Sequence, residues 1–513
     1  MLANTSHLSE ILAWLHAAAP GARLSSDSRS VSEGEVFLAY PGDTADGRAY
    51  IAQAIGRGAK AVLYEDADSF SWHDEWKASH RAVTDLKNNA GRIANAWCGN
   101  PDARMFTVAV TGTNGKTSCS QWLGRAISRL GDPTAVVGTL GIGLFESGAP
   151  RTFETTGFTT PDAVVLQCAL AESRDAGAKA LAIEASSIGL EQGRLNGMHF
   201  DAVLFTNLTR DHLDYHGDMA AYEAAKTMLF DWSGLKHAII NLDDAMGLRL
   251  IRRMKQSASP ASIIGYTLTG QDVEGVASLR ATEVRTSHAG TLFQLESPFG
   301  SAQVKIQLVG EFNVSNILGV LGVLLAKGIA WKAAIDAIES LTAVPGRMQQ
   351  LGGEENPLVV IDYAHTPDAL EKTLDTLRHV ARQRQGRLWC VFGCGGDRDP
   401  GKRAQMGAVA ATADQIIVTS DNPRNEDASA IIAQIVEGLK SVQIQQTQLN
   451  VIEDRAAAIL WAVRQSARPD VVLIAGKGHE SYQEIKGKKR PFLDADHAAL
   501  ALAARATMKG TGL

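Results

Sequence analysis

The sequence lacks the long apolar segments that a membrane-spanning protein needs. Its apolar runs, such as Val471–Ala475, are far shorter than the roughly 20 residues of a spanning helix. The N-terminal segment has no basic stretch followed by an apolar core, which is the pattern of a secretion signal. These absences predict a cytoplasmic protein that does not insert into a membrane.

Cysteine is also scarce, and the chain has a small excess of negative charge. The chain has 513 residues and 5 cysteines, an odd number without the paired spacing typical of zinc sites or disulfide frameworks. We therefore expect reduced thiols, most of them buried. The net charge is −6 and there is no long basic run, which argues against nucleic acid as the main partner.

Short runs rich in Val and Ile alternate with Ala- and Leu-rich stretches of helical character along the chain. This alternation is typical of parallel sheets covered by helices, so the sequence predicts an α/β protein. A length of 513 residues exceeds what one core usually supports. Loop-like segments at 99–102 and 344–346 divide the chain into three predicted domains, residues 1–103, 104–343 and 344–513.

The most specific local signal is a glycine-rich turn that follows the apolar run 105–110. The turn reads Gly112-Thr113-Asn114-Gly115-Lys116-Thr117-Ser118. Small residues let backbone N–H groups approach phosphate oxygens, while a Lys-Thr pair adds a charge and a hydroxyl that can ligate Mg²⁺. The commonest pattern has a glycine where this chain has Val110, so the loop is a shorter variant. The turn predicts nucleotide binding.

The middle third contains a dense group of polar residues near predicted strand ends. Glu184 ends an apolar run and could reach a metal ion at the phosphate loop, while Ser186 either binds a ligand or caps a helix. The segment 206–217 holds two acids, two histidines and an arginine, which are costly to bury without a ligand or metal. Lys226 lies on a predicted helix, where a lysine is ordinarily a solvated surface charge.

The last third repeats one arrangement four times, a strand followed by a polar loop. The predicted strands are 358–361, 388–392, 415–419 and 471–475. Because ligands of open α/β sheets bind at the carboxyl ends of parallel strands, the four following loops are best explained as one binding edge.

Together these segments resemble the Mur ligases, ATP-dependent enzymes that build the peptidoglycan stem peptide one amino acid at a time. The resemblance covers nearly the whole chain and rests on the segments 112–117, 184–187, 206–217, 312–316, 346–348 and 362–367. It implies a central phosphate-loop ATPase sheet, an N-terminal UDP-binding domain and a C-terminal Rossmann-like domain. It also implies that ATP converts a substrate carboxylate into an acyl phosphate, which an amine then displaces.

Within this family, the segment Asp421–Arg424 looks like the signature of the member that attaches meso-diaminopimelate to UDP-N-acetylmuramoyl-L-alanyl-D-glutamate. A guanidinium at Arg424 suits the additional carboxylate of diaminopimelate, which argues against a lysine-adding ligase. The N-terminal segments 27–29 and 46–48 fit a UDP-binding domain and argue against a folate polyglutamate synthetase. The loops of the last third imply a second substrate, which a nucleotide-dependent switch does not need.

The resemblance also assigns roles to single residues at the matching motif positions. The ATP-binding set is Gly112, Thr113, Asn114, Gly115, Lys116, Thr117, Ser118, Asn313, Asn316, Arg347 and Asp362. The UDP-substrate set is Ser26, Ser28, Asp43, Thr44, Ala45, Thr155, Thr156, Ser186, Gln192 and Arg194. The diaminopimelate set is Arg398, Asp421, Asn422, Pro423, Arg424, Gly476 and Glu480. The catalytic set is Lys116, Glu184, His212 and Lys226.

Mg²⁺ is the expected cofactor, with ATP as a co-substrate. The resemblance implies that Thr117, Glu184, His212 and Lys226 hold the metal, with Lys226 as a carbamate. Two positions depart from the family pattern, Glu154 in place of an asparagine and Ala428 in place of a proline. For Asn313 and Asn316, capping of a helix is the structural alternative to nucleotide contact. The expected partners are small molecules, and the expected state is a monomer.

Overall fold

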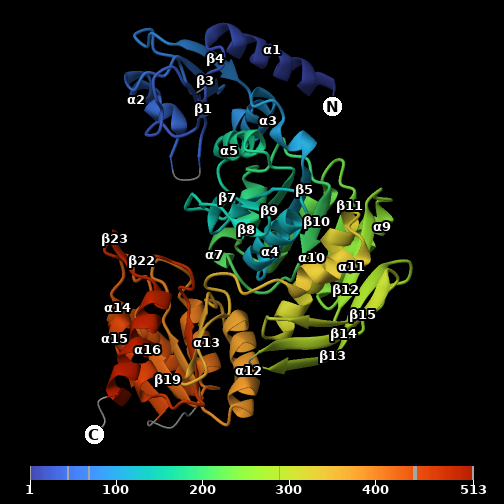
Figure 1. Cartoon of the computed structure of the whole chain (residues 1–513). Helices are drawn as coiled ribbons and strands as arrows, with labels where there is room; N and C mark the ends of the chain where they lie inside the picture. Colours follow the sequence, from blue (N-terminus) through green and yellow to red (C-terminus); the bar gives the residue numbers. More distant parts are fainter. Residues whose placement is uncertain (1, 43–44, 68–69, 288, 443–447, 511–513) are drawn as a thin grey trace.

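The computed structural model describes all residues except 1, 43–44, 68–69, 288, 443–447 and 511–513. Figure 1 shows three α/β domains in chain order, the N-terminal one in blue, the central one in green and the C-terminal one in orange and red. Each contains its own sheet. The predicted fold class and three-domain architecture are therefore confirmed. Over the described residues, no helix is both long enough and apolar enough to span a membrane.

The N-terminal domain is built on a parallel sheet of order β1-β2-β3-β4. The strands are β1 (Leu24–Ser25), β2 (Val36–Ala39), β3 (Ala61–Glu65) and β4 (Ser79–Val83). The helices are α1 (Leu2–Ala18), α2 (Ile51–Gly56) and α3 (Leu86–Trp97). Every residue of β2 is buried, as expected for a strand covered on both faces.

The central domain contains an 11-stranded sheet of order β15-β14-β13-β12-β11-β10-β5-β9-β6-β7-β8. Its strands are β5 (Phe106–Thr111), β6 (Thr134–Gly138), β7 (Gly141–Glu146), β8 (Ala149–Pro150), β9 (Ala180–Glu184), β10 (Ala202–Phe205), β11 (His237–Asn241), β12 (Ser262–Thr267), β13 (Ala277–Ser287), β14 (Gly290–Ser297) and β15 (Gly300–Ile306). The strands from β6 through β13 in this order run parallel, and antiparallel pairs complete both edges.

Helices cover both faces of this sheet. The helices of this domain are α4 (Lys116–Arg129), α5 (Ala163–Asp175), α6 (Ser187–Glu191), α7 (Leu213–His216), α8 (Met219–Thr227), α9 (Ala245–Gln256), α10 (Glu311–Ala326) and α11 (Trp331–Glu339). Val108 and Val110 of β5 pack with α4 and α10, whereas Ala109 faces the core that contains α5 and α9. The alternation of side chains along β5 thus joins two cores and leaves its carboxyl end free to enter the phosphate loop.

The C-terminal domain has a sheet of order β16-β17-β21-β18-β19-β20 and a separate hairpin, β22-β23. The strands are β16 (Gln349–Gly352), β17 (Leu358–Asp362), β18 (Leu388–Phe392), β19 (Gln415–Val418), β20 (Leu449–Val451), β21 (Val471–Ala475), β22 (Tyr482–Ile485) and β23 (Lys488–Pro491). The helices are α12 (Pro367–Gln383), α13 (Gly401–Ala410), α14 (Ala428–Ser441), α15 (Arg455–Gln465) and α16 (Asp494–Gly510).

The four strands predicted for this domain are β17, β21, β18 and β19, which are neighbours and run parallel. Their following loops therefore open on one edge, as the sequence predicted. Figure 1 shows α12 beside β13 of the central domain, so the C-terminal domain faces the central sheet.

Candidate active site

The phosphate loop joins β5 to α4, and two of its glycines are required by their surroundings. Gly112 has φ +147°, and a Cβ there would collide with the Thr206 hydroxyl. Gly115 has φ +87°, and a Cβ would lie 2.6 Å from Oδ1 of Asn316. Both positions combine a left-handed backbone with close packing, which only glycine tolerates. The turn thereby directs the first N–H groups of α4 toward the place where a phosphate would bind.

The side chain of Lys116 folds back onto this loop and binds two of its carbonyl groups. Its Nζ donates to the carbonyl oxygens of Gly112 at 2.7 Å and Thr113 at 2.8 Å. Burial lowers the pKa of Lys116, and the nearby Glu184 carboxylate opposes that shift. The loop thus holds a half-buried lysine beside its backbone amides, an arrangement that favours anionic ligands.

Glu184, at the end of β9, is fully buried against the loop. Its carboxylate accepts hydrogen bonds from the Thr117 hydroxyl at 3.0 Å and from the Thr139 N–H at 2.9 Å. Burial raises its pKa, and the charge of Lys116 lowers it. Thr117 and Glu184 therefore present neighbouring oxygens, which are the ligands that Mg²⁺ prefers.

Among the described residues, no group of three or more His, Cys, Asp and Glu side chains forms a ready-made metal cage. Thr117 and Glu184 offer two side chains with oxygen donors, and Mg²⁺ commonly takes one or two protein oxygens and completes its coordination with phosphates and water. The donor set at the loop is therefore compatible with the predicted cofactor.

Lys226 on α8 is only 1% exposed, so the ordinary surface role of a helical lysine does not apply. Its Nζ donates to the Gly112 carbonyl at 3.0 Å and lies 4.5 Å from the centre of the Tyr222 ring. Burial, together with the charge of Lys116, lowers the pKa of Lys226 well below its usual value. The lysine thus lies on the phosphate loop with its neutral form favoured.

His212 begins the short helix α7 with a left-handed φ of +53°. Its Nε2 lies 3.5 Å from the Asp211 carboxylate, and its ring lies edge-on to that of Tyr222. Burial lowers the pKa of His212, which favours the neutral imidazole that can ligate a metal. The segment 206–217 thus places His212 on the same side of the loop as Lys226, because Tyr222 contacts both.

Arg347 extends from the C-terminal domain to the phosphate loop. Its guanidinium lies over the Tyr363 ring at 4.3 Å and donates to the Thr117 hydroxyl at 3.4 Å. Asp362 accepts the backbone N–H of Met348 at 2.8 Å and therefore fixes the segment that carries Arg347. Residues of two domains thus meet at one loop.

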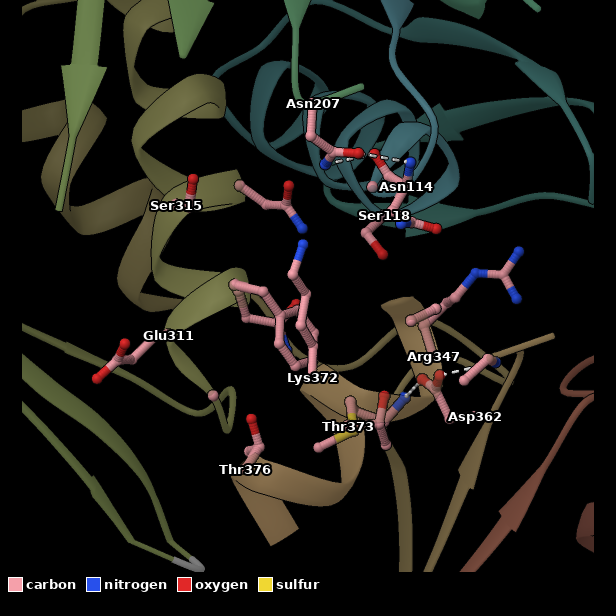
Figure 2. A pocket seen from close by; sticks show the side chains of 18 of the residues that line it. Asn114, Ser118, Asn207, Glu311, Ser315, Arg347, Asp362, Lys372, Thr373 and Thr376 are labelled. Carbon is pink, nitrogen blue, oxygen red and sulfur yellow. Dashed lines mark hydrogen bonds between the residues drawn. The ribbon is translucent and has the colours of Figure 1, made fainter. Parts of the chain in front are cut away.

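A cavity of about 1060 Å³ lies between the phosphate loop, α10 and α12. That volume suits a ligand of nucleotide size. Of the predicted ATP-binding residues, the following line it: Thr113, Asn114, Gly115, Lys116, Thr117, Ser118, Asn313, Asn316, Arg347 and Asp362. Figure 2 shows Asn114 and Ser118 on the central side of the cavity, and Lys372, Thr373 and Asp362 on the other.

Asn207 and the α12 side chains were not predicted. Asn207 accepts the Asn114 N–H at 2.9 Å and donates to its carbonyl at 3.2 Å, which clamps the phosphate loop (Figure 2). Its place directly after β10 is a signal that could have identified it. Asn114 also donates to Asp368 of α12 at 3.1 Å, an interdomain contact for which the sequence gives no signal.

Asn313 and Asn316 both face this cavity. Asn313 also donates to the carbonyl of Val309, which lies just before α10, so part of its side chain has a structural function. Asn316 lies against Gly115 of the phosphate loop.

Three of the predicted UDP-substrate residues meet around Thr160. Ser186 caps α6 by accepting the Gly189 N–H at 3.0 Å, and its hydroxyl also lies 2.9 Å from that of Thr160. Arg194 donates to the Thr160 carbonyl at 2.7 Å and to Gln192 at 2.8 Å. Ser186 therefore caps a helix, which was the alternative interpretation of this residue, and it also belongs to this polar cluster.

Thr155 and Thr156 lie outside that cluster. Thr155 is exposed, and the hydroxyl of Thr156 donates to the Phe158 carbonyl at 3.0 Å. A second pair, Thr159–Thr160, is connected to the phosphate loop: the Thr159 hydroxyl lies 3.1 Å from that of Thr139, which contacts Glu184. The sequence contains both pairs, and only the second lies just before Asp162, the N-cap of α5. Glu154 is also exposed.

The uridine-side residues belong to the loops that follow β1 and β2. Ser26 donates to Asp162 of the central domain at 2.7 Å, and Ser28 donates to Gln53 at 2.8 Å. Ala45 accepts the Gly42 N–H at 2.8 Å. Asp43 and Thr44 lie outside the described residues.

Most of the predicted diaminopimelate residues converge at the C-terminal strand edge. Asn422 donates to Glu480 at 2.7 Å, and a Cβ on Gly476 would lie 2.6 Å from the Asp421 carboxylate. Arg424 has a left-handed φ of +51°, and its guanidinium donates to the Gly396 carbonyl at 2.6 Å. A Cβ on Gly396 would collide with the Pro423 carbonyl, so these two loops pack backbone to backbone.

Arg398 is exposed on the loop after β18. That placement leaves its guanidinium in solvent.

Lys477 organises this edge and was missed by the sequence reasoning. The fully buried ammonium donates to Asn422 at 3.0 Å, to Glu480 at 2.9 Å and to the Tyr482 carbonyl at 2.6 Å. Arg403 of α13, likewise buried, holds the loop after β18 through Glu426 and the Gly395 carbonyl. Lys477 lies in a predicted polar loop, whereas the position of Arg403 on a helix gives no signal.

A phosphate loop in one domain and a polar strand edge in the next define a nucleotide-using enzyme with a second substrate site. Family models agree with this architecture. They match the Mur ligase family catalytic domain at residues 22–96, the Mur ligase middle domain at 110–324 and the Mur ligase glutamate ligase domain at 346–478. The chain belongs to the Mur ligase family, as its motifs predicted.

Individual relatives give a more specific comparison than the family models. The chain is 65% identical to a UDP-N-acetylmuramoyl-L-alanyl-D-glutamate--2,6-diaminopimelate ligase of Janthinobacterium sp. (strain Marseille), with 98% of each chain covered. A ligase of the same name from Neisseria meningitidis serogroup B is 44% identical, over 95% of this chain and 96% of that one. A solved structure of a ligase with this name is 38% identical with a TM-score of 0.66, covering 94% of this chain and 95% of the other.

A more distant structure, MurF ligase from Thermotoga maritima in complex with ADP, is 17% identical with a TM-score of 0.63, covering 95% of this chain and 98% of that one. At that identity the likeness demonstrates a shared fold alone.

Proposed function

We propose that this chain is an ATP-dependent ligase that joins meso-diaminopimelate to UDP-N-acetylmuramoyl-L-alanyl-D-glutamate in peptidoglycan precursor synthesis, with release of ADP and phosphate. The observation that carries the proposal is the position of the loop Asp421–Arg424. The amide of Asn422 in this loop donates to the Glu480 carboxylate at 2.7 Å and so holds the loop beside Glu480. This edge offers both a cation and an anion to a zwitterionic amino acid. The relatives that cover 98% of the chain carry the name of this activity.

The reaction needs an activated carboxylate, because a carboxylate is a poor electrophile and an acyl phosphate is a good one. The glutamate side chain of the UDP-linked substrate attacks the γ-phosphorus of ATP, and ADP leaves. The diaminopimelate amine then attacks the acyl carbon, loses a proton and displaces phosphate. Lys116, Arg347 and the N–H groups of the phosphate loop are suited to hold and neutralise the transferring group.

Thr117 and Glu184 would hold a Mg²⁺ ion, and His212 with Lys226 as a carbamate would hold a second. When bound, such ions offset the repulsion between ATP and the substrate carboxylate. The buried position of Lys226 supports the carbamate, because a lowered pKa increases the fraction of neutral amine, the form that reacts with carbon dioxide. Asn313 and Asn316 complete the proposed nucleotide site.

The UDP-linked substrate would span two domains. Ser26, Ser28 and the segment 43–45 would contact the uridine side, and Ser186, Gln192 and Arg194 the peptide side. Thr155 and Thr156 stay predictions for this site, and the contact of Thr160 with both Ser186 and Arg194 adds it to the candidates.

Selection of diaminopimelate over lysine would depend on Arg424. Its guanidinium suits the additional carboxylate, Glu480 suits an ammonium, and Arg398 suits the remaining carboxylate. Lysine would leave Arg424 without its ligand partner, a penalty of about 1–3 kcal/mol. We also propose a cytoplasmic location and a monomeric state for this ligase.

An isotope experiment tests the reaction. The protein is incubated with ATP, Mg²⁺, diaminopimelate and UDP-dipeptide whose glutamate carboxylate carries ¹⁸O. Two results are expected. The product should be heavier than the UDP-dipeptide by one diaminopimelate residue, and the released phosphate should contain one ¹⁸O atom. Product without ¹⁸O in phosphate would rule out the acyl phosphate, and the absence of product would rule out the function.

A further inference from the structure

Asp162 connects the N-terminal domain to the central domain. Its Oδ1 accepts the Ser26 hydroxyl at 2.7 Å, and its Oδ2 accepts the Tyr40 hydroxyl at 2.7 Å. Ser26 follows β1 and Tyr40 follows β2, whereas Asp162 stands at the start of α5 in the central domain. One carboxylate thus receives two short hydrogen bonds from the loops of another domain.

Capping of α5 explains only part of this arrangement. Asp162 accepts the Val164 N–H at 2.9 Å, which is the ordinary function of an N-cap residue. Asp454 does the same for α15, where it accepts the Ala457 N–H at 2.8 Å. The bonds from Ser26 and Tyr40 are additional, and both cross between domains.

The same segment also contacts the proposed peptide side of the substrate site. Thr160, two residues before Asp162, accepts a hydrogen bond from Arg194 at 2.7 Å. Arg194 also interacts electrostatically with the hydroxyl group of Tyr40. Burial and the Asp162 carboxylate raise the pKa of Tyr40, and the charge of Arg194 opposes the rise. Asp162 therefore lies between the proposed uridine-side and peptide-side residues.

Apolar side chains of α5 pack the central domain against the N-terminal domain. Val164 and Cys168 of α5 belong to the same buried cluster as Ile11, Leu24 and Ile93 of the N-terminal domain. Packing of this kind has no preferred direction, whereas hydrogen bonds to a carboxylate fix a relative orientation.

We propose that Asp162 is a positioning residue for the UDP-linked substrate. Its carboxylate fixes Ser26 of the N-terminal domain at a set distance from Arg194 of the central domain, so that a single extended substrate meets both. This inference rests on the proposed function, and it assigns Asp162 an effect on the UDP-linked substrate that it does not have on ATP or diaminopimelate.

Asp162→Asn and Tyr40→Phe test the proposal. Asparagine is also a good N-cap, so it keeps the bond to Val164, but its NH₂ group cannot accept a hydroxyl proton. We expect Asp162→Asn to raise KM for the UDP-dipeptide about tenfold, because a hydrogen bond to a charged group is worth that ratio or more. Tyr40→Phe should raise it severalfold. For both variants, kcat and the KM values for ATP and diaminopimelate should stay within twofold.

Asp454→Asn is the matched control, since it changes a helix N-cap far from this interface and should leave every KM unchanged. Titration calorimetry of the UDP-dipeptide without ATP supplies a readout that does not depend on turnover, and the Kd should rise with the KM. In the double variant that combines Asp162→Asn with Tyr40→Phe, the two increases in KM for the UDP-dipeptide should be less than additive, because both substitutions remove the same contact.

The results separate this inference from the proposed function. Wild-type affinity for the UDP-dipeptide in Asp162→Asn and Tyr40→Phe would overturn the inference while the wild-type protein still makes product. A reduced kcat and melting temperature with unchanged KM would also overturn it, since that pattern marks a purely structural residue. A wild-type protein that binds the UDP-dipeptide but makes no product would overturn the proposed function alone.

Discussion

The nucleotide end and the amino-acid end of this protein are built by different means. At the nucleotide end, a short local motif supplies backbone amides, and the half-buried Lys116 and the buried ionisable groups of Lys226 and Glu184 lie around it. At the amino-acid end, the ammonium of Lys477 holds Glu480 of its own loop and Asn422 of the loop after β19. The backbone cradle of the first end is a product of one segment, whereas its charged groups and the whole second end come together only once several strands have assembled.

This difference determines what substitutions should do. A change at the nucleotide end removes a group from a cluster in which Lys116 and Glu184 shift each other's pKa and the charge of Lys116 lowers the pKa of Lys226. A change at the amino-acid end affects the recognition of one substrate. We therefore expect losses of turnover at the first end and losses of selectivity at the second.

The largest effect is expected for Glu184→Gln. The amide keeps the size of the side chain but removes the charge that faces Thr117 and the proposed Mg²⁺ site, so kcat/KM should fall about 1000-fold. Steady-state kinetics with ATP as the varied substrate measure this. Glu172→Gln, at an exposed position on α5, is the control and should retain full activity. A loss of less than tenfold at Glu184 would remove it from the catalytic set.

Lys226→Ala should reduce kcat about 100-fold, because the proposed carbamate supplies a carboxylate near the second metal. Added acetate or another short carboxylate should restore part of the rate in a coupled ADP assay. Lys332→Ala removes a lysine whose side chain is 87% exposed and should change nothing. Full activity of Lys226→Ala without added carboxylate would contradict the carbamate, and so would a loss that no carboxylate restores.

Arg424→Lys should raise KM for diaminopimelate between about 10- and 100-fold, since an ammonium cannot reproduce a bidentate pair. The KM for ATP should stay the same, which separates the two ends directly. Arg468→Lys, at an exposed ion pair of the same domain, serves as the control for substitution of arginine. Normal kinetics with diaminopimelate would defeat the assignment of Arg424.

The smallest effect is expected at His199, away from both ends. Hydrogen bonds to Asp102 and Asp201 raise the pKa of His199 to about 9. Because the folded pKa exceeds the unfolded value of 6.5, the stabilisation is complete below pH 6.5 and is lost as the pH rises through 9. With the side chain 38% exposed, solvent screening leaves about 1 kcal/mol.

Urea titrations of His199→Gln check this sign. The free energy of unfolding should lie below that of the wild type by about 1 kcal/mol at pH 6 and by much less at pH 9.5. Substrate KM values should be unchanged. An equal deficit at both pH values would mean that the charge of His199 does not act as described.

The contrast between the two ends also explains what the sequence could predict. The strand 471–475 and the phosphate loop follow from local composition, because a buried parallel strand needs a continuous apolar run and a phosphate turn needs its glycines. The burial of Lys226 does not follow from its helix. Its surroundings are set by Gly112 and Tyr222, and only the family resemblance pointed to the site.

The residues that sequence reasoning missed all act across long sequence distances. Asn207 contacts the phosphate loop, Lys477 joins two loops of the amino-acid end, and Asp162 joins two domains. Similarly, the choice between the pairs Thr155–Thr156 and Thr159–Thr160 depends on the approach of Ser186, which no local pattern reveals. Contacts between distant segments are determined by tertiary packing.

The most direct test of this account is the ratio of kcat/KM for meso-diaminopimelate to that for L-lysine in the wild-type protein, measured at saturating ATP and UDP-dipeptide. If Arg424 at the assembled edge selects the additional carboxylate, the ratio should lie between about 5 and 150, the range that a penalty of about 1–3 kcal/mol gives. A ratio near one would contradict the account, because the amino-acid end would then not distinguish the substrates that its charges are proposed to separate.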